Sequence, residues 1–300
     1  MAGRQRDVRT LRVTAYAKVN LSLEVLGRRP DGFHEVRSVM QSISLADELL
    51  IDEADELAVE CEIRELADEN NLIVAAAKAL AKRSEREQGA RIRLNKGIPV
   101  ASGLGGASSD AAAALVGLSR LWGMDLPTSE LIGLAAGLGS DVPFFLSGGT
   151  ALVSGRGEIV DPLPDAQPVW LTLLVPGHTL ASKTALLYRH LTSALWTQGA
   201  RTARMAAVIS QGLPLTPDLA GNAFEQVAAE VFPTISAYEE ALLDAGASSA
   251  HLSGAGPALF SIFGSEAEAR AVARGVETRG FKPLVARTLS AADACPVARE

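Results

Sequence analysis

Alternation of apolar and polar residues marks the first part of the chain. From residue 12 to 26, β-branched and apolar residues alternate with polar ones, and the alternation returns from 35 to 54. A period of two predicts β-strands. The sequence PDG at 30–32 has the composition of a β-turn. The two segments are therefore predicted to pair as a hairpin with residues 27–34 at its tip.

Several polar and aromatic residues of this hairpin could serve a binding site. Lys18 and Asn20 are two positions apart, so a strand would place both on one face. An ordinary solvated face is the alternative. Phe33 and His34 follow the turn directly. Phe33 could begin the return of the strand to the core and His34 could simply be exposed, or both could contact a ligand.

Helical spacing of apolar residues follows the hairpin. It predicts helices over 68–83, 108–122 and 126–138, and Asn70 or Asn71 is the expected N-cap of the first of them. A short strand at 90–94 is predicted between the first two helices.

The second half of the chain returns to a mixed pattern after a segment rich in Pro and Asp at 161–168. Predicted strands are 169–175, two within 251–263 and one at 281–287, and predicted helices are 184–195, 221–231, 235–245 and 266–279. This order favours a small α+β sandwich. We place the boundary in the Pro/Asp segment, which gives domains of residues 1–165 and 166–300.

Composition narrows the class of protein. Of 300 residues 48% are hydrophobic, enough for a sizeable core, and the formal net charge is −7. Arg and Lys form no long run, and no apolar run is long enough to span a membrane, which argues against nucleic-acid and membrane partners. Two cysteines and four histidines lie far apart, so neither a disulfide framework nor a zinc site is indicated. We expect a cytoplasmic protein whose arginine-spaced amino terminus is a solvated tail and not a targeting arm.

A glycine-rich loop is the strongest chemical feature. Residues 99–109 contain glycines at 103, 105 and 106 among small side chains, which leaves consecutive backbone N–H groups accessible. The predicted helix over 108–122 points its amino terminus at this loop, and its dipole and unpaired N–H groups favour an anion there. Phosphate is the natural ligand.

The loop fits neither of two familiar phosphate-binding templates. A Walker A loop needs a lysine after the glycines, and the dinucleotide fingerprint needs a glycine where Ser108 stands. The loop could also be shaped by packing alone, with Ser108 or Ser109 capping the helix.

Three further sites have two interpretations each. Asp141 lies between a glycine and an apolar run, where a carboxylate can be an N-cap or a general base beside a cleft. Tyr188 could belong to the core or rim, or contact a ligand. Gly254 and Gly256 could be simple turn glycines, or a second backbone wall against the phosphate loop.

The loop PVASGLGGASS, from Pro99 to Ser109, resembles the P-x-x-x-G-L-G-x-S-S signature of the GHMP kinase superfamily. Three further motifs resemble the branch that phosphorylates a cytidine diphosphate-linked methylerythritol: AYAKVNLSLEVLGRRPDGFHEV, DENNLIVAAAKAL and GLGSDVPFFLSGG. The resemblance is strong over residues 12–160 and rests mainly on LSGAGPALFSIF in the carboxyl-terminal half.

The resemblance implies an α+β fold of two domains, an amino-terminal ribosomal-protein-S5-like domain that binds ATP and a carboxyl-terminal ferredoxin-like α+β sandwich, with the active site in the cleft between them. The implied reaction is ATP-dependent phosphorylation of the 2-hydroxyl of 4-diphosphocytidyl-2-C-methyl-D-erythritol, in the non-mevalonate isoprenoid pathway. Asp141 corresponds to the general base. Lys18 corresponds to the lysine that orients the hydroxyl and stabilises developing negative charge, with Asn20 beside them.

The resemblance also implies ligand contacts and cofactors. His34 corresponds to the residue that hydrogen-bonds the cytosine edge, Phe33 to an aromatic wall of the substrate site, and Tyr188 to the aromatic that stacks on cytosine. The residues implied for ATP line the adenine pocket or form the loop: Asn71, Lys96, Pro99, Gly103, Leu104, Gly105, Gly106, Ser108 and Ser109. Mg²⁺ is expected to be held largely through ATP, with no protein ligand assigned.

Two residues depart from the family pattern. Phe33 stands where tyrosine is frequent, which removes a phenolic hydrogen bond but keeps the ring contact. Lys183, in ASKTALLY, stands where a small hydroxyl residue is usual.

The resemblance leaves two alternative functions to consider. One is a different GHMP small-molecule kinase, of the homoserine or mevalonate type, against which DGFH and GSDVPFFL argue. The second is a nucleotide-binding sensor without catalysis, against which the presence of both Lys18 and Asp141 argues. The expected assembly is a monomer or weak homodimer.

Overall fold

The computed structural model describes residues 10–66, 68, 71–83, 89–124, 126–177 and 182–296. The arginines before residue 10, Asn70 and His178 lie outside the described residues, as does the predicted solvated tail that those arginines form. None of the helices in the described ranges combines the length and apolar character that a membrane span requires.

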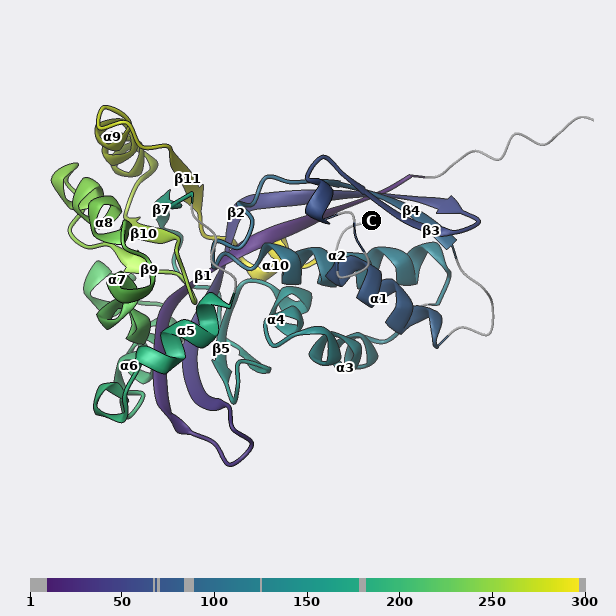
Figure 1. Cartoon of the computed structure of the whole chain (residues 1–300), viewed down its shortest axis with the longest axis horizontal. Coiled ribbons are helices and arrows are strands. Elements are labelled where there is room, and N and C mark those ends of the chain that lie inside the picture. The colour runs from purple at the N-terminus through teal and green to yellow at the C-terminus, as the bar shows by residue number, and fades with distance from the viewer. Residues whose placement is uncertain are drawn as a thin grey trace, which may run out of the picture.

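The β1–β2 hairpin is the longest feature of the fold. Strand β1 spans Leu11–Arg28 and β2 spans His34–Ala54, and they pair antiparallel along their length, as the alternating pattern predicts. Register shifts between β1 and β2, at Tyr16/Ala17, Asn20/Ser22 and Val25/Gly27, bend the hairpin, which crosses the middle of the molecule in Figure 1.

Within the described residues, this hairpin belongs to a seven-stranded sheet in the order β3-β4-β2-β1-β8, with β5 beside β2 and β6 beside β5. The other members are β3 (Leu57–Cys61), β4 (Gly89–Asn95), β5 (Thr150–Ser154), β6 (Ile159–Pro162) and β8 (Gly221–Asn222).

Helices gather beside this sheet in Figure 1 and enclose the first core. They are α1 (Leu72–Ala81), α2 (Gly106–Leu121), α3 (Thr128–Leu138) and α4 (Val142–Ser147), with the short 3₁₀ helix η1 (Arg64–Leu66) before α1. Helix α2 is central because every residue from Ser109 to Ser119 is buried. Its alanines allow the sheet and neighbouring helices to approach closely.

The carboxyl-terminal half contains the second sheet of the described chain, in the order β11-β7-β10-β9. Its strands are β7 (Trp170–Leu174), β9 (His251–Leu252), β10 (Leu259–Phe263) and β11 (Pro283–Arg287). The helices of this half are α5 (Lys183–His190), η2 (Ser193–Leu195), α6 (Ala200–Ser210), η3 (Pro217–Leu219), η4 (Ala223–Gln226), α7 (Ala228–Val231), α8 (Ile235–Asp244), α9 (Glu266–Glu277) and α10 (Ala291–Ala294). Helix α9 packs on the second sheet, whereas α6 packs on β1 and β2, and α10 packs on β2 and α4. The α+β fold class is confirmed.

The two halves share structure. One core cluster joins β1 residues such as Val19 and Leu21 to Leu171 and Phe260 of the second sheet. Strand β8 also pairs parallel with β1 of the first sheet. The boundary at residues 165 and 166 remains a prediction, and it divides segments whose side chains pack together.

Two local predictions are wrong, and one alternative that the sequence left open is not realised. The segment predicted as a helix over 221–231 is β8, a 3₁₀ turn and a short α-helix, because the Asn222 side chain accepts from Phe224 N and donates to Leu252 O and Gly254 O. The helix expected over 184–195 ends at His190. Neither Ser108 nor Ser109 caps α2, whose N-cap is Gly105 with a φ of 78°.

The prediction for α1 is confirmed at the one candidate that the structure describes. Asn71 is the N-cap, and its side chain accepts a hydrogen bond from Ile73 N at 2.8 Å. Both cysteines, Cys61 and Cys295, are free.

Candidate active site

A cavity of about 860 Å³ lies where the β1–β2 hairpin, the glycine loop, helix α5 and the turn after β9 come together. Of the residues predicted for the site, all line this cavity except Leu104 and Ser109. Leu104 is fully buried, and its carbonyl accepts from Lys18 N at 2.9 Å. Ser109 is also buried, and its hydroxyl donates to Tyr16 O at 2.7 Å. These two residues do not face the cavity, and their hydrogen bonds attach the loop and the start of α2 to strand β1.

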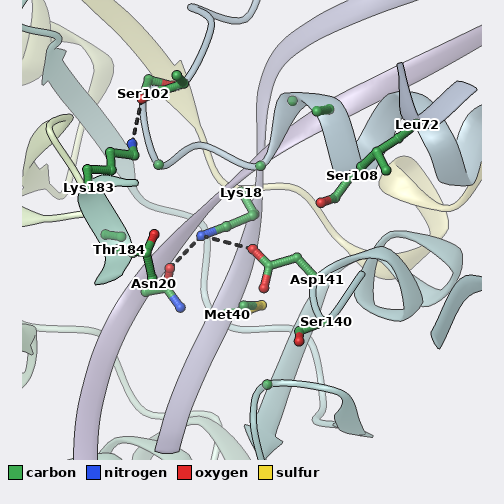
Figure 2. A pocket seen from close by; sticks show the side chains of 18 of the residues that line it. Lys18, Asn20, Met40, Leu72, Ser102, Ser108, Ser140, Asp141, Lys183 and Thr184 are labelled. Carbon is green, nitrogen blue, oxygen red and sulfur yellow. Dashed lines mark hydrogen bonds and ion pairs between the residues drawn. The ribbon is translucent and has the colours of Figure 1, made fainter. Parts of the chain in front are cut away.

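Lys18 and Asn20 lie on the same face of β1, as their spacing predicts. Lys18 Nζ donates to Asn20 Oδ1 at 2.6 Å (Figure 2). Asn20 Nδ2 donates to Ser38 Oγ at 2.7 Å. Ser38 in turn donates to Ser22 O at 2.6 Å. This chain of hydrogen bonds fixes the asparagine amide and aims its oxygen at the lysine.

Asp141 supplies the opposite charge. Its Oδ2 lies 3.6 Å from Lys18 Nζ (Figure 2). Burial lowers the pKa of Lys18, and the nearby Asp141 carboxylate partly offsets that effect. Asp141 occupies the N-cap position of α4 but makes no side-chain capping hydrogen bond, so capping does not account for its carboxylate. The side chain is 34% exposed and stays open to the cavity.

The glycine loop is shaped by the turn Ser253–Pro257. From the sequence, the glycines of this turn could be simple turn glycines or a backbone wall against the loop. A Cβ on Gly103 would lie 2.3 Å from Ser253 O, and the φ of Gly103 is +92°, so only glycine fits there. Ser253 Oγ donates to Gly103 O at 3.0 Å, and Ala258 N donates to Ser102 O at 2.8 Å. The turn is therefore a backbone wall against the loop.

The first turn of α2 opens into the same cavity. The first hydrogen bond at this end of the helix runs from Ser109 N to Gly105 O at 2.9 Å. The N–H groups of Gly106, Ala107 and Ser108 precede it, and these three residues line the cavity. Such a cluster of N–H groups at the positive end of a helix dipole is suited to phosphate oxygens.

Lys96 is held in a buried cluster of charges that sequence reasoning missed. Its Nζ pairs with Asp47 and, at 2.9 Å, with Asp110 Oδ2. Burial acts to lower the pKa of Lys96, but the two carboxylates together raise it. Asp47 Oδ1 also accepts from Gly97 N and Ile98 N at 2.7 and 2.8 Å, which fixes the segment leading into the loop. Asp47 and Asp110 carry no local motif that marks them as partners.

Asp110 is the least satisfied member of this cluster. It is 3% exposed, and its Oδ1 finds no hydrogen-bond partner among the described residues. Burial and the neighbouring Asp47 carboxylate raise the pKa of Asp110 from 3.8 to about 7, against the opposing effect of Lys96.

Aromatic side chains form the other end of the cavity. His34 and Tyr188 stack with ring centroids 4.3 Å apart and an interplanar angle of 11°, and Phe224 meets the Tyr188 ring edge-on at 4.9 Å. Burial and the nearby Arg28 lower the pKa of His34, so the ring is neutral near pH 7. Burial, with a smaller effect of Asp141, raises the pKa of Tyr188 to about 12.

Phe33 lies nearer to solvent than the other aromatic residues. Its ring is 53% exposed and carries the Arg156 guanidinium 4.8 Å from its centroid. The turn is fixed by Asp31, whose carboxylate accepts from Phe33 N at 3.1 Å. Arg156 and Trp196, which meets His34 edge-on at 6.3 Å, are further residues of this region that sequence reasoning missed.

The described residues contain no cluster of three His, Cys, Asp or Glu side chains that could hold a metal ion. Asp141 and Ser108 are among the oxygen-bearing side chains that line the cavity. Such single oxygen donors suit an ion that a polyphosphate carries with it more than an ion held by the protein alone.

Comparisons with known proteins place this geometry in a family. Residues 71–149 match the model of the GHMP kinases N terminal domain, and residues 205–282 match the GHMP kinases C terminal model. These are domains of ATP-dependent kinases, so the fold and loop define a phosphotransferase class. The 4-diphosphocytidyl-2-C-methyl-D-erythritol kinase of Dehalococcoides mccartyi strain BAV1 is 42% identical over 284 residues, which cover 94% of this chain and 100% of that protein.

Solved structures agree. A crystal structure of 4-(cytidine 5'-diphospho)-2C-methyl-D-erythritol kinase is 30% identical with a TM-score of 0.79, and the match covers 93% of this chain and 99% of that one. The homoserine kinase of Cytophaga hutchinsonii is similar in fold, with a TM-score of 0.69 at 19% identity over 97% of each chain. The chain belongs to the 4-diphosphocytidyl-2-C-methyl-D-erythritol kinase family of the GHMP kinases.

Proposed function

We propose that this chain transfers the terminal phosphoryl group of ATP to the 2-hydroxyl of 4-diphosphocytidyl-2-C-methyl-D-erythritol, giving the 2-phosphate in the non-mevalonate isoprenoid pathway. The observation that carries the proposal is one cavity lined by the Lys18–Asp141 pair, with Nζ and Oδ2 3.6 Å apart, by the first turn of α2, and by the His34–Tyr188 stack.

Asp141 acts as the general base. Its carboxylate is open to the cavity and makes no capping hydrogen bond to the backbone of α4. It takes the proton of the acceptor hydroxyl as the oxygen attacks phosphorus. The partly exposed position leaves room for a substrate hydroxyl beside the carboxylate.

Lys18 orients the acceptor and stabilises negative charge. Its ammonium is fixed by Asn20 and Asp141, so no reorganisation is needed when charge develops on the transferred group. Because phosphoryl transfer has a loose transition state, positioning and electrostatic stabilisation are the main contributions that a protein can make.

The glycine loop and the first turn of α2 hold the triphosphate. Backbone N–H groups of Gly106, Ala107 and Ser108 are the donors, and the helix dipole adds to their attraction. Lys96 and Asn71 line the adenine side of the cavity. Mg²⁺ bound to ATP would lie by Ser108 and Asp141, where it would neutralise charge on the phosphate oxygens.

His34, Phe33 and Tyr188 bind the cytidine end. A neutral imidazole has one donor and one acceptor nitrogen, which suits the edge of a cytosine. Tyr188 offers a flat ring for stacking, but His34 covers that ring in the present arrangement. Binding of cytosine on the face of Tyr188 that His34 covers therefore requires His34 to rotate away and present its edge.

A turnover assay tests the proposal. ATP consumption is measured with 4-diphosphocytidyl-2-C-methyl-D-erythritol, homoserine and mevalonate as separate acceptors. We expect turnover with the cytidyl substrate alone. Turnover with homoserine or mevalonate would move the chain to another GHMP kinase activity, and ATP binding without turnover would favour a sensor. The cytoplasmic location and the monomer or weak homodimer remain predictions.

A further inference from the structure

Lys183 is a cationic residue beside the glycine loop, and the mechanism proposed above gives it no role. It is the first residue of α5 and lines the cavity. Its Nζ donates to Ala101 O at 2.5 Å and to Gly256 O, so it joins the glycine loop to the turn Ser253–Pro257. These partners are 82 and 73 residues away in sequence.

Both partners of Lys183 are neutral carbonyl groups. In the part of the chain that the structure describes, no carboxylate lies within ion-pair distance of this ammonium, unlike Lys18 and Lys96, which pair with aspartates. An ammonium has three N–H donors, and two are taken by Ala101 and Gly256. A half-buried cation with a remaining donor and no counter-ion favours an anionic ligand.

The charges around Lys183 come from few residues. The loop Pro99–Gly105 and the turn Ser253–Pro257 contain no ionisable side chain. Lys18 on β1 is the charged group that acts on Lys183, and Asp141 pairs with Lys18. Tyr188, further along α5, stays neutral because its pKa is raised. Burial, and to a lesser extent Lys18, lowers the pKa of Lys183 to about 8.

We propose that Lys183 is a second cation for the polyphosphate of the nucleoside triphosphate, binding a phosphate oxygen through its remaining N–H while it holds the loop to the turn. This inference deepens the proposed function and rests on it. The cavity would take two phosphate-bearing ligands, ATP and the cytidine diphosphate-linked substrate. Lys183 is assigned to ATP because its partner Ala101 belongs to the glycine loop.

The assignment has a consequence for pH. In the free protein, Lys183 loses its proton as the pH rises through about 8. A bound triphosphate favours the charged form, so binding above this pH takes up a proton and affinity falls by up to tenfold per pH unit. Lys18 also has a lowered pKa, and a variant is needed to separate the two lysines.

The experiment measures binding by calorimetry at about pH 7 to 9.5, on either side of the Lys183 titration, using Mg²⁺ with the slowly hydrolysed analogue ATPγS, and cytidine diphosphate separately. The variants are Lys183→Met, which removes the charge, and Lys183→Arg, which keeps it without titrating. Arg189→Met, on the exposed side of the same helix, is the control: it removes one positive charge from α5 without changing Lys183.

We expect Lys183→Met to weaken ATPγS about 10- to 100-fold at pH 7, the range for losing a charge-assisted hydrogen bond, and to change cytidine diphosphate less than about twofold. Lys183→Arg should keep the affinity at pH 7 and lose the fall above about pH 8. The control should match the wild type.

Three results would overturn the proposal. One is unchanged ATPγS affinity in Lys183→Met, and another is a loss confined to cytidine diphosphate, which would assign Lys183 to the cytidyl ligand. The third is an alkaline fall that persists in Lys183→Arg, which would assign the titration to Lys18. Because the readout is nucleotide binding, absence of turnover with the polyol would contradict the proposed function and leave this test intact.

Discussion

Lys18 is a buried cation whose charge is balanced by a carboxylate that stays partly open to the cavity. It is 3% exposed, and Asn20 and Asp141 surround its Nζ. An ammonium in this position is already desolvated and oriented before any ligand arrives. The cost of ordering it is met during folding, which leaves it preorganised for charge that develops in a reaction.

Replacement of Asp141 by asparagine tests the base at the residue scale. The variant keeps the shape of the side chain but cannot accept a proton, so kcat should fall by about 10²-fold or more. Steady-state kinetics with the cytidyl substrate measure this, with circular dichroism to verify folding. Turnover near the wild-type value in a folded variant removes Asp141 from the role.

Replacement of His34 by alanine tests the cytidine end. The imidazole lines the cavity among the aromatic side chains, in ring contact with Tyr188 and Trp196. KM for the cytidyl substrate should therefore rise about tenfold, the range for one or two lost hydrogen bonds, while KM for ATP stays unchanged. An equal increase for both ligands would mean that His34 has a structural role instead.

At the scale of elements, the glycine loop depends on its contact with the carboxyl-terminal turn. The loop accepts from Ser253 and Ala258, and Lys183 joins both segments. Ser253 and Gly103 are 150 residues apart in sequence, so the loop conformation is set by a distant segment.

Replacement of Gly103 by alanine tests this dependence. A Cβ there would lie 2.3 Å from Ser253 O, which forces the turn to shift. Alanine would also have to adopt the left-handed backbone of Gly103, which by itself costs about 1–3 kcal/mol. We expect a lower Tm and an increase in KM for ATP of about tenfold or more, since the loop that we propose to hold the triphosphate is displaced.

Gly133 on α3 provides the matched control for that variant. A Cβ there meets no atom within 4 Å, so Gly133→Ala should leave kinetics unchanged and stabilise the helix by about 0.5–1 kcal/mol. If Gly103→Ala behaves like this control, the turn does not shape the loop.

Predictions from local pattern succeeded for elements whose bonding partners are near in sequence or whose periodic pattern extends over many residues. The β1–β2 hairpin and the Asn71 cap of α1 are of this kind. The failure at 221–231 has a tertiary cause, since the Asn222 side chain bonds to Leu252 and Gly254 while β8 pairs with β1. Helical propensity in that segment could not reveal those contacts.

At the scale of the whole molecule, the Asp47–Lys96–Asp110 cluster links folding to pH. The pKa of Asp110 is raised from 3.8 to about 7, so the folded state keeps a proton that the unfolded state has released between these values. The stability that this proton provides is complete below about pH 4 and is lost as the pH rises through about 7.

The free energy of unfolding should therefore fall between about pH 4 and pH 7 in the wild type through this residue. Asp110→Asn, which resembles the protonated form, should flatten that part of the profile. Urea unfolding at several pH values measures it, and Asp161→Asn at an exposed position is the control. A profile of Asp110→Asn that parallels the wild type would show that another group titrates.

The sequence by itself determined the hairpin, the glycine loop with its helix, and the shared face of Lys18 and Asn20, because strand alternation and helical period are properties of neighbouring residues. Only the tertiary structure decided which charges meet. Asp110 joins Lys96, Tyr188 stacks on His34, and Lys183 reaches Ala101 across 82 residues. Such contacts depend on how distant segments pack, and no local pattern in the chain records that packing.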